Sequence, residues 1–359
     1  MSLDTLRGFD MFFIMGGDAL FVTICSLFPG TWMSGLGKQM YHVAWDGFTF
    51  YDLIFPLFLF LAGVSFPFSL AKQRSMGKDN VAISKKIVSR GLLLILFGAV
   101  YNGLLQFDFA ELRYASVLGR IGSAWMFAAL LYLWLGRKVT VWVSMLLLLG
   151  YWALLAWVPV PGADSLSPFS MDGSLVSYID RLLLPGRLHD GLHDPEGVLS
   201  TLPAIVTALL GMFTGEFVRL RSLGAYKKVA YLLLAALALL FIGWVWSFVF
   251  PINKNLWSSS FVCFAGGWSL ILFALFYFIV DVLQWRGWTL FFRVIGLNSI
   301  TIYLAQQFVD FHKLNTSLLG GVMNLLPASF YPVAYWACYV AVCWCLLYFL
   351  YRKKIFLKV

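Results

Sequence analysis

The chain has 359 residues, of which 61% are hydrophobic, 18% aromatic and only 12% charged, and its formal net charge is +9. Soluble domains carry roughly 25% charged residues, so this composition cannot be covered by water in a compact soluble shape. It excludes an ordinary soluble protein and predicts an all-α, polytopic transmembrane helical bundle that forms a single domain over residues 1–359. Membrane topology explains the positive charge, and we expect no nucleic-acid partner.

Apolar runs of about 20 residues are long enough to cross the lipid bilayer as helices. Ten spans are expected, at residues 6–28, 52–71, 88–107, 117–135, 140–158, 199–218, 228–250, 258–280, 290–310 and 329–351. A shorter apolar piece at 318–326 is expected to be re-entrant or interfacial, and it leaves a count of 11 open.

The basic residues predict the orientation of this bundle. Eighteen of the 26 Lys and Arg residues lie in the even-numbered connections between spans or at the C-terminus. Cytoplasmic loops are enriched in Lys and Arg, so both termini are expected to be cytoplasmic and the odd-numbered connections external. We expect no cleavable signal peptide, because Met1 leads almost directly into the first span.

The stretch from Tyr41 to Ser65 places polar residues at the mouth of an apolar span. His42, Trp45 and Asp46 precede this span, and Asp52 opens it. A lone interfacial histidine is more often a satisfied polar group than a catalyst. However, a neighbouring carboxylate fixes the tautomer of an imidazole, which suits a general base. His42 is therefore a candidate catalytic residue on the external side.

The first span also contains ionisable groups, and each costs roughly 2.5–3.5 kcal/mol at membrane depth on insertion scales. Asp4 and Arg7 lie three residues apart on one helical face, which predicts either an ion pair at the helix start or a ligand-holding pair. Asp10 and Asp18 share a face further along the span. Asp18 lies deep enough that a functional role is favoured.

Polar residues in three later segments are further candidates. Arg120 near the external end of the fourth span needs a carboxylate partner or an anionic ligand unless it reaches the interface. Asn253 and Lys254 lie in an external turn that suits either loop chemistry or a solvated hairpin. Asn298 introduces hydrogen-bonding groups into the ninth span, where it can join helices.

The segment HDGLHDPEG contains His189, His193, Asp194 and Glu196 and resembles a metal-ligand cluster. We favour a helix start instead, with Asp194 as the N-cap and Pro195 in the first position of the sixth span. The five cysteines lie in apolar segments without C-x-x-C spacing, so we expect no disulfide framework and no metal site.

Seven motifs, taken in order, resemble those of a known family. They are SLDTLRG, H-x-x-W-[DN]-G followed by DLIFPLFLFLAGVS, YIDRLLL, DPEGVLSTLPAIVTALLG, PINKNLWSSS, GLNSITIYL and LYRKKIF. They cover nearly the whole chain and resemble the heparan-α-glucosaminide N-acetyltransferase family and its bacterial relatives. The resemblance implies a transmembrane acyltransferase that moves acetyl from cytoplasmic acetyl-CoA to the amine of a glucosamine-type sugar on the opposite side.

The resemblance also implies roles for individual residues. The catalytic histidine of the family matches His42, which we expect to act as base or transient acetyl carrier. A functional asparagine of the family aligns with Asp18, the expected orienter of His42, and Asp46 also replaces an asparagine. Residues expected to bind acetyl-CoA or the sugar are Trp45, Asp46, Asp52, Arg7, Arg120, Asn253, Lys254 and Asn298.

No counterpart of the lumenal N-terminal domain of the lysosomal family members is seen in this sequence. We therefore expect a small amino-sugar or oligosaccharide acceptor and a bacterial inner membrane, and a homodimer is left open. One alternative is a solute transporter in which Asp18, His42 and Asp52 form a proton relay. Another is an O-acyltransferase that modifies hydroxyls of envelope polysaccharide.

Overall fold

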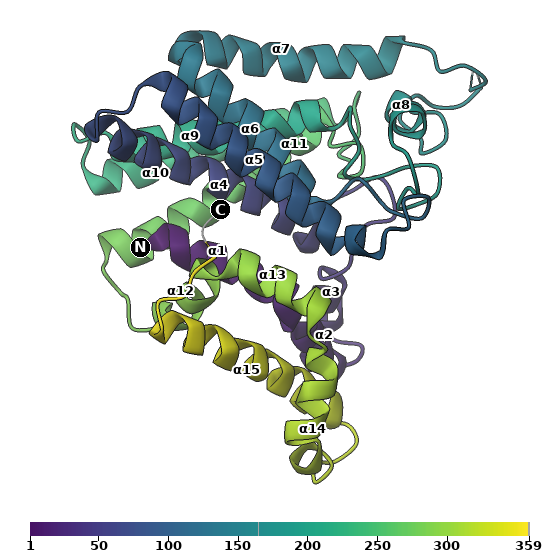
Figure 1. Cartoon of the computed structure of the whole chain (residues 1–359), viewed down its shortest axis with the longest axis vertical. Coiled ribbons are helices and arrows are strands. Elements are labelled where there is room, and N and C mark those ends of the chain that lie inside the picture. Colours follow the sequence, from purple (N-terminus) through teal and green to yellow (C-terminus); the bar gives the residue numbers. More distant parts are fainter. Residues whose placement is uncertain (164, 358–359) are drawn as a thin grey trace. The chain divides into compact units, whose positions relative to one another are not determined.

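The computed structural model describes residues 1–163 and 165–357 and consists of α-helices joined by loops (Figure 1). Among those residues the β-type pairing is limited to one isolated bridge between Arg113 and Gly186. The prediction of an all-α protein is therefore confirmed.

The chain divides into two compact units. Unit 1 contains Met1–Val43, Thr49–Ile54 and the described residues from Leu272 onward, and unit 2 contains Ala44–Phe48 and Phe55–Ile271. The chain therefore passes from one unit to the other within the H-x-x-W-[DN]-G region. The single domain expected over residues 1–359 stays a prediction.

Unit 1 is organised around the first helix of the chain. Its helices are α1 (Ser2–Phe12), α2 (Asp18–Ser26), α3 (Trp32–Lys38), α12 (Thr289–Leu297), α13 (Ser299–Phe308), α14 (Phe311–Met323) and α15 (Tyr331–Arg352). Helix α1 packs closely against α12, and α14 packs against α15. The buried core of this unit includes Met11, Met15, Val294, Ile295, Ile302, Phe311, Tyr339, Cys343 and Leu347.

A sharp kink separates α1 from α2. The backbone over Phe13–Gly17 is wound more widely than an α-helix, and Gly16 has a φ of +113°, which L side chains rarely adopt. A Cβ at Gly16 would also lie 3.1 Å from the Tyr339 ring of α15. Glycine is therefore required at this position, and the kink sets the direction in which Asp18 leaves it.

Unit 2 contains most of the remaining helices. They are α4 (Phe50–Ser75, whose first turn belongs to unit 1), α5 (Asn80–Tyr101), α6 (Val117–Trp134), α7 (Gly136–Trp157), α8 (Leu175–Leu183), α9 (Thr201–Arg219), α10 (Ala225–Trp246) and α11 (Ser259–Phe276, whose end belongs to unit 1). Helix α6 packs against α5 and α9. The connection between α7 and α9 contains α8, which Ser174 caps through its side chain.

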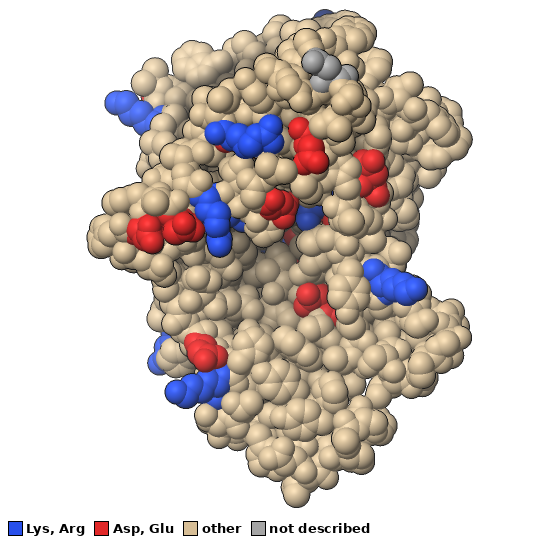
Figure 2. All heavy atoms as spheres, turned by 90° about the vertical axis from the view of Figure 1, so that its right-hand side faces the viewer, with Lys and Arg blue, Asp and Glu red and all other residues tan. Residues whose placement is uncertain are grey.

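Eight helical segments of the described residues are long and apolar enough to cross a membrane. They are Ser2–Ser26, Phe50–Ser75, Val117–Trp134, Gly136–Trp157, Thr201–Arg219, Ala225–Trp246, Ser259–Val282 and Tyr331–Arg352. On the face shown in Figure 2, charged side chains cover a small part of the visible surface, and several of them lie beside a side chain of opposite charge. These features support an integral membrane protein, and the count of ten or eleven spans and the orientation of the termini stay predictions.

Two of the ten expected spans are not among these eight segments. The third, expected over 88–107, is α5, which begins at Asn80 and therefore includes Lys85, Lys86 and Arg90. The ninth, expected over 290–310, is interrupted at Asn298, where φ is −121° and ψ is 21°, and this break separates α12 from α13. The apolar piece at 318–326 lies in the last turns of α14 and the loop after it.

Candidate functional site

The segment between α3 and α4 is closed at its base and presents His42. The Tyr51 backbone N–H donates to the Gln39 carbonyl at 3.0 Å, and the Thr49 hydroxyl, whose single proton is shared with Asp52, lies 2.7 Å from the Tyr41 carbonyl oxygen. These bonds draw the two ends of the loop together at the start of α4. His42 is consequently held beside the first turn of that helix.

His42 pairs with Asp52. The two side chains lie 2.6 Å apart between Nδ1 and Oδ1, and the histidine side chain is 48% exposed whereas the carboxylate is 1% exposed. The other carboxylate oxygen accepts hydrogen bonds from the backbone N–H and the hydroxyl of Thr49, at 3.1 and 2.9 Å. Because a carboxylate accepts from Nδ1–H, the neutral ring presents Nε2 as its accepting nitrogen. This arrangement suits a general base held by a buried, oriented carboxylate.

Asp18 approaches this pair through Tyr51. The Asp18 carboxylate lies close enough to the Tyr51 hydroxyl to interact with it, and the Tyr51 ring lies 4.7 Å from the His42 ring between centroids. Asp52 therefore occupies the orienting position at Nδ1 that the sequence suggested for Asp18. Sequence reasoning missed Tyr51 and Thr49, although Thr49 lies three residues before Asp52, a spacing typical of residues that cap a helix start.

The second half of the motif belongs to unit 2. The Trp45 indole N–H donates to the Phe169 carbonyl at 2.7 Å, and its ring meets His193 edge-on at 5.2 Å between centroids. The Gly47 backbone N–H donates to the Ile252 carbonyl at 2.8 Å. Trp45 is thus an anchor within unit 2, and its expected role in binding acetyl-CoA or the sugar stays a prediction.

Asp46 is joined to the turn after α10. The Asn253 amide donates to Asp46 Oδ1 at 3.0 Å, and its own oxygen accepts the Leu256 backbone N–H at 2.8 Å. Asn253 is fully buried and holds this turn in shape, whereas Lys254 beside it is half-buried. The structure therefore brings Trp45, Asp46 and Asn253 into one set of contacts.

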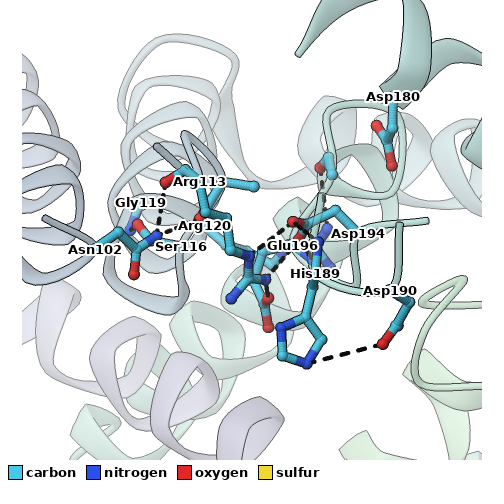
Figure 3. Close-up of polar contacts among 12 residues, drawn as sticks. Asn102, Arg113, Ser116, Gly119, Arg120, Asp180, His189, Asp190, Asp194 and Glu196 are labelled. Carbon is cyan, nitrogen blue, oxygen red and sulfur yellow. Dashed lines mark hydrogen bonds and ion pairs between the residues drawn. The ribbon is translucent and has the colours of Figure 1, made fainter. Parts of the chain in front are cut away.

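A cluster of charged side chains joins two loops of unit 2 (Figure 3). Arg113 donates from Nε and Nη2 to the two oxygens of Asp194, at 2.7 and 2.6 Å, and also pairs with Glu196. Burial alone raises the pKa of Asp194, but the hydrogen bonds from Arg113 lower it below its usual range. The same carboxylates raise the pKa of Arg113 against the opposing effect of burial. The pair is therefore ionised and cross-links the loops.

Two expectations about this segment can now be compared with its geometry. The prediction that a helix starts at Asp194 is wrong, because α9 begins at Thr201. Asp194 instead accepts hydrogen bonds from Arg113. Nε2 of His189 lies 4.0 Å from Oδ1 of Asp190 (Figure 3). His193, by contrast, is buried, and its Nδ1 lies 3.0 Å from the Ser177 hydroxyl. No group of three potential metal ligands converges among the described residues.

Arg120 is almost completely buried in α6. Its Nη2 donates to the Gly197 carbonyl at 3.0 Å and to the Ser200 hydroxyl, and its guanidinium carbon lies 5.0 Å from the centroid of the Trp257 ring. Within the part of the chain that the structure describes, Nε and Nη1 have no hydrogen-bond partner. Its direct partners are thus a carbonyl and a hydroxyl, whereas the sequence predicted a carboxylate partner or an anionic ligand, and the two buried nitrogens without a partner carry three N–H groups.

Arg7 and Asn298 both belong to unit 1, and each is held by contacts with residues close to it in the sequence. Arg7 approaches Asp4 at 3.7 Å, as expected for an ion pair at the helix start, while Asp10 is fully buried. Asn298 is buried at the break between α12 and α13, where its amide donates to the Val294 carbonyl at 3.1 Å. This polar side chain therefore lies at the residue where the ninth expected span is interrupted.

The chain is similar to known proteins over most of its length. No protein-family model matches it. It is 29% identical to the human heparan-alpha-glucosaminide N-acetyltransferase over 389 residues, which covers 90% of this chain and 57% of that protein. The mouse protein of the same name gives 29% identity over 390 residues with the same coverage. The chain therefore spans about half the length of these curated relatives, and the similarity supports a family relationship with heparan-alpha-glucosaminide N-acetyltransferase.

Proposed function

We propose that this protein is a membrane acetyltransferase that moves an acetyl group from acetyl-CoA to the amine of a glucosamine-type sugar. The observation that carries the proposal is the His42–Asp52 pair, 2.6 Å apart, with an exposed imidazole and a buried carboxylate. The similarity to two N-acetyltransferases over 90% of the chain supports the same reaction class. We further propose a cytoplasmic donor, an external acceptor and a bacterial inner membrane.

The proposed chemistry begins with a neutral sugar amine, which attacks the thioester carbonyl. Nε2 of His42 removes the proton from the attacking nitrogen, and the buried Asp52 stabilises the imidazolium that forms. Collapse of the tetrahedral intermediate breaks the C–S bond, and His42 returns the proton to the departing thiolate. The products are the N-acetyl sugar and free coenzyme A, so that atoms and charge balance.

The other predicted residues are proposed to bind the substrates. Arg120 is the best supported of them, because two nitrogens of its buried guanidinium, with three N–H groups, have no hydrogen-bond partner among the described residues. Binding roles for Arg7, Trp45, Asp46, Asn253, Lys254 and Asn298 stay predictions. The contacts of Trp45, Asp46 and Asn253 within unit 2 are equally compatible with a supporting role.

Acetyl transfer from radiolabelled acetyl-CoA to glucosamine by the purified protein in detergent tests the proposal. We expect His42→Ala to lower the rate by at least about 100-fold, because general-base catalysis contributes about 10²–10⁴-fold. His189→Ala is the matched control, since His189 is also exposed and lies beside an aspartate. Full activity of His42→Ala would remove this residue from the chemistry. Label that is retained on the wild-type protein without acceptor, and is absent from His42→Ala, would identify His42 as an acetyl carrier.

A proton-coupled transporter is a second candidate, because Asp18, His42 and Asp52 are linked through Tyr51. Solute uptake into vesicles that depends on a proton gradient and not on acetyl-CoA would favour it. The remaining alternative is an O-acyltransferase. A panel of acceptor sugars with and without an amine distinguishes it from the N-acetyltransferase, since an O-acyltransferase would label hydroxyl acceptors and leave the amine untouched.

A further inference from the structure

A flat group of rings lies where α14 meets α15 in unit 1. The His312 Nδ1 and the Tyr335 hydroxyl are 2.7 Å apart, and the two ring planes differ by only 12° with centroids 6.1 Å apart. The hydroxyl sits at the far edge of the tyrosine ring, so this hydrogen bond joins the rings edge to edge rather than face to face. His312 and Tyr335 are therefore hydrogen-bonded with their ring planes nearly parallel, and we call this pair the aromatic plate.

The plate is supported from within unit 1. The Tyr339 ring lies 4.6 Å from the His312 ring, and the edge of Trp336 meets His312 at 5.6 Å and 87°. Gln306 in turn donates to the Tyr339 hydroxyl at 3.1 Å. His312 remains exposed although its ring is held by three aromatic neighbours. A preorganised surface of this kind loses little conformational entropy when a ligand binds.

The chemistry of the plate matches a pyranose ring that carries an amine. A sugar ring presents C–H groups on its faces, which pack on flat aromatic surfaces, and hydroxyls on its edge, which need hydrogen-bonding groups. The imidazole and phenol edges are such groups, and the exposed Asp310 carboxylate lies at the start of the same helix. A protonated amine is also attracted to aromatic faces, by about 0.5–1 kcal/mol at exposed sites.

The plate is connected to His42 by packed residues of the same unit. Tyr339, beneath the plate, packs against Gly16 in the kink between α1 and α2. Asp18 follows two residues later and interacts with the side chain of Tyr51, whose ring lies 4.7 Å from the His42 ring between centroids. The positive-inside rule also predicts that the loop with His42 and the connection before α15 face the same side.

We propose that the aromatic plate is a carbohydrate-binding subsite that holds a sugar ring of the amino-sugar acceptor, an inference that rests on the proposed acetyltransferase function. Tyrosine and tryptophan also gather at membrane interfaces, where they face lipid headgroups. The hydrogen bond that holds His312 beside Tyr335, with the two ring planes 12° apart, fixes the position of a hydrogen-bonding imidazole, and this favours a ligand surface over such a belt. If the plate binds sugar, substitutions in it lower the affinity for the sugar; if it is part of an interfacial belt, they do not.

The test compares steady-state kinetics of the wild type, His312→Ala, Tyr335→Phe and the control Phe308→Ala in detergent. Phe308 is an exposed aromatic residue of α13, 60% exposed. We expect His312→Ala to raise the acceptor KM about tenfold, and Tyr335→Phe about threefold, with the acetyl-CoA KM and kcat within twofold. Phe308→Ala should change none of these values. An unchanged acceptor KM in His312→Ala with an unchanged melting temperature would overturn the plate.

A binding measurement separates this proposal from the proposed function. Saturation-transfer NMR of glucosamine with the purified protein, without acetyl-CoA, should show a signal that His312→Ala reduces at least fivefold. If the wild type transfers no acetyl group but binds glucosamine through His312, the acetyltransferase proposal fails and the plate stands. If glucosamine binds equally well to both proteins, or to neither, the plate is rejected whatever the acetyl transfer shows.

Discussion

Asp52 performs two tasks in the first turn of α4. One oxygen holds His42, and the other accepts from the backbone and hydroxyl of Thr49, as a capping carboxylate does. A neutral amide in this position would keep its shape but lose the charge that stabilises an imidazolium. The buried Asp52 side chain thus both stabilises the start of α4 and orients the proposed catalytic histidine.

We predict that Asp52→Asn lowers acetyl transfer by about 100-fold or more, whereas Asp18→Asn lowers it by less than about tenfold. The reason is that Asp52 contacts His42 Nδ1, whereas Asp18 acts through the Tyr51 hydroxyl, to which an asparagine oxygen can still serve as acceptor. Initial rates of both variants at saturating acetyl-CoA provide the comparison. A loss in Asp18→Asn that equals the loss in Asp52→Asn would restore Asp18 as the orienting residue.

Asp180 and His193 in the connection between α7 and α9 make opposite contributions to the pH dependence of stability. Burial raises the pKa of Asp180 from 3.8 to about 6, and burial lowers the pKa of His193 from 6.5 to about 4. The stabilising contribution of protonated Asp180 is present below pH 3.8 and is lost as pH rises through about 6. That of neutral His193 is present above pH 6.5 and is lost as pH falls through about 4.

Because these windows overlap, the two effects largely cancel between pH 4 and 6. We predict that His193→Gln becomes less stable relative to wild type as pH rises from 4 to 6, and that Asp180→Asn becomes more stable relative to wild type over the same range. Each contribution is on the order of 3 kcal/mol across its window. The melting temperature of each protein in detergent at several pH values gives the pH dependence of its stability. The same pH dependence for all three proteins would contradict the opposite contributions of Asp180 and His193.

The contact between α1 and α12 depends on two glycines. A Cβ at Gly296 would lie 2.0 Å from the Asp4 carbonyl oxygen, and one at Gly8 would lie 1.7 Å from the Phe292 carbonyl oxygen. Both obstacles are backbone atoms, so no side-chain rearrangement can relieve them. Small residues that let helix backbones approach are typical of membrane helix pairs.

We predict that Gly296→Ala destabilises the protein by about 2–3 kcal/mol, the upper range for overpacking, because α12 must move away from α1. Gly320→Ala in α14 is the matched control, since nothing lies within 4 Å of its Cβ position. It should be neutral or stabilising by up to about 1 kcal/mol, as expected for alanine in a helix interior. Thermal unfolding of both variants tests this, and equal melting temperatures would refute the close approach.

The arrangement of the whole chain in the membrane is a prediction that labelling can test. We expect Ser34→Cys, in the first connection, to react with a membrane-impermeant maleimide in intact cells, because the positive-inside rule makes this connection external. Ser75→Cys, in the basic second connection, should react only after lysis. Both positions are exposed, and the wild-type protein gives the background of its native cysteines. The reverse pattern would invert the topology and place His42 in the cytoplasm.

Much of the candidate site could be predicted from the sequence because it lies in local motifs. Composition indicates apolar helices, and His42 and Asp52 stand in one continuous stretch, so their selection needed no knowledge of distant contacts. Long apolar runs give reliable helices, because backbone groups in lipid must satisfy their hydrogen bonds within the same segment. Helix α5 and the break at Asn298 differ from the prediction, because hydropathy reports neither a helix end nor a kink.

Pairings between side chains, by contrast, depended on how the helices fold together. The kink at Gly16 directs Asp18 to Tyr51 and leaves Nδ1 of His42 to Asp52, and no local pattern reports that choice. Arg113 meets Asp194 across 81 residues, and His312 meets Tyr335 across 23. Hydropathy depends on neighbours along the chain, whereas a hydrogen bond depends on where loops and helix ends meet in space. That difference explains why the sequence indicated the helices and His42, whereas the orienting carboxylate, the loop cross-link and the aromatic plate emerged from the folded chain.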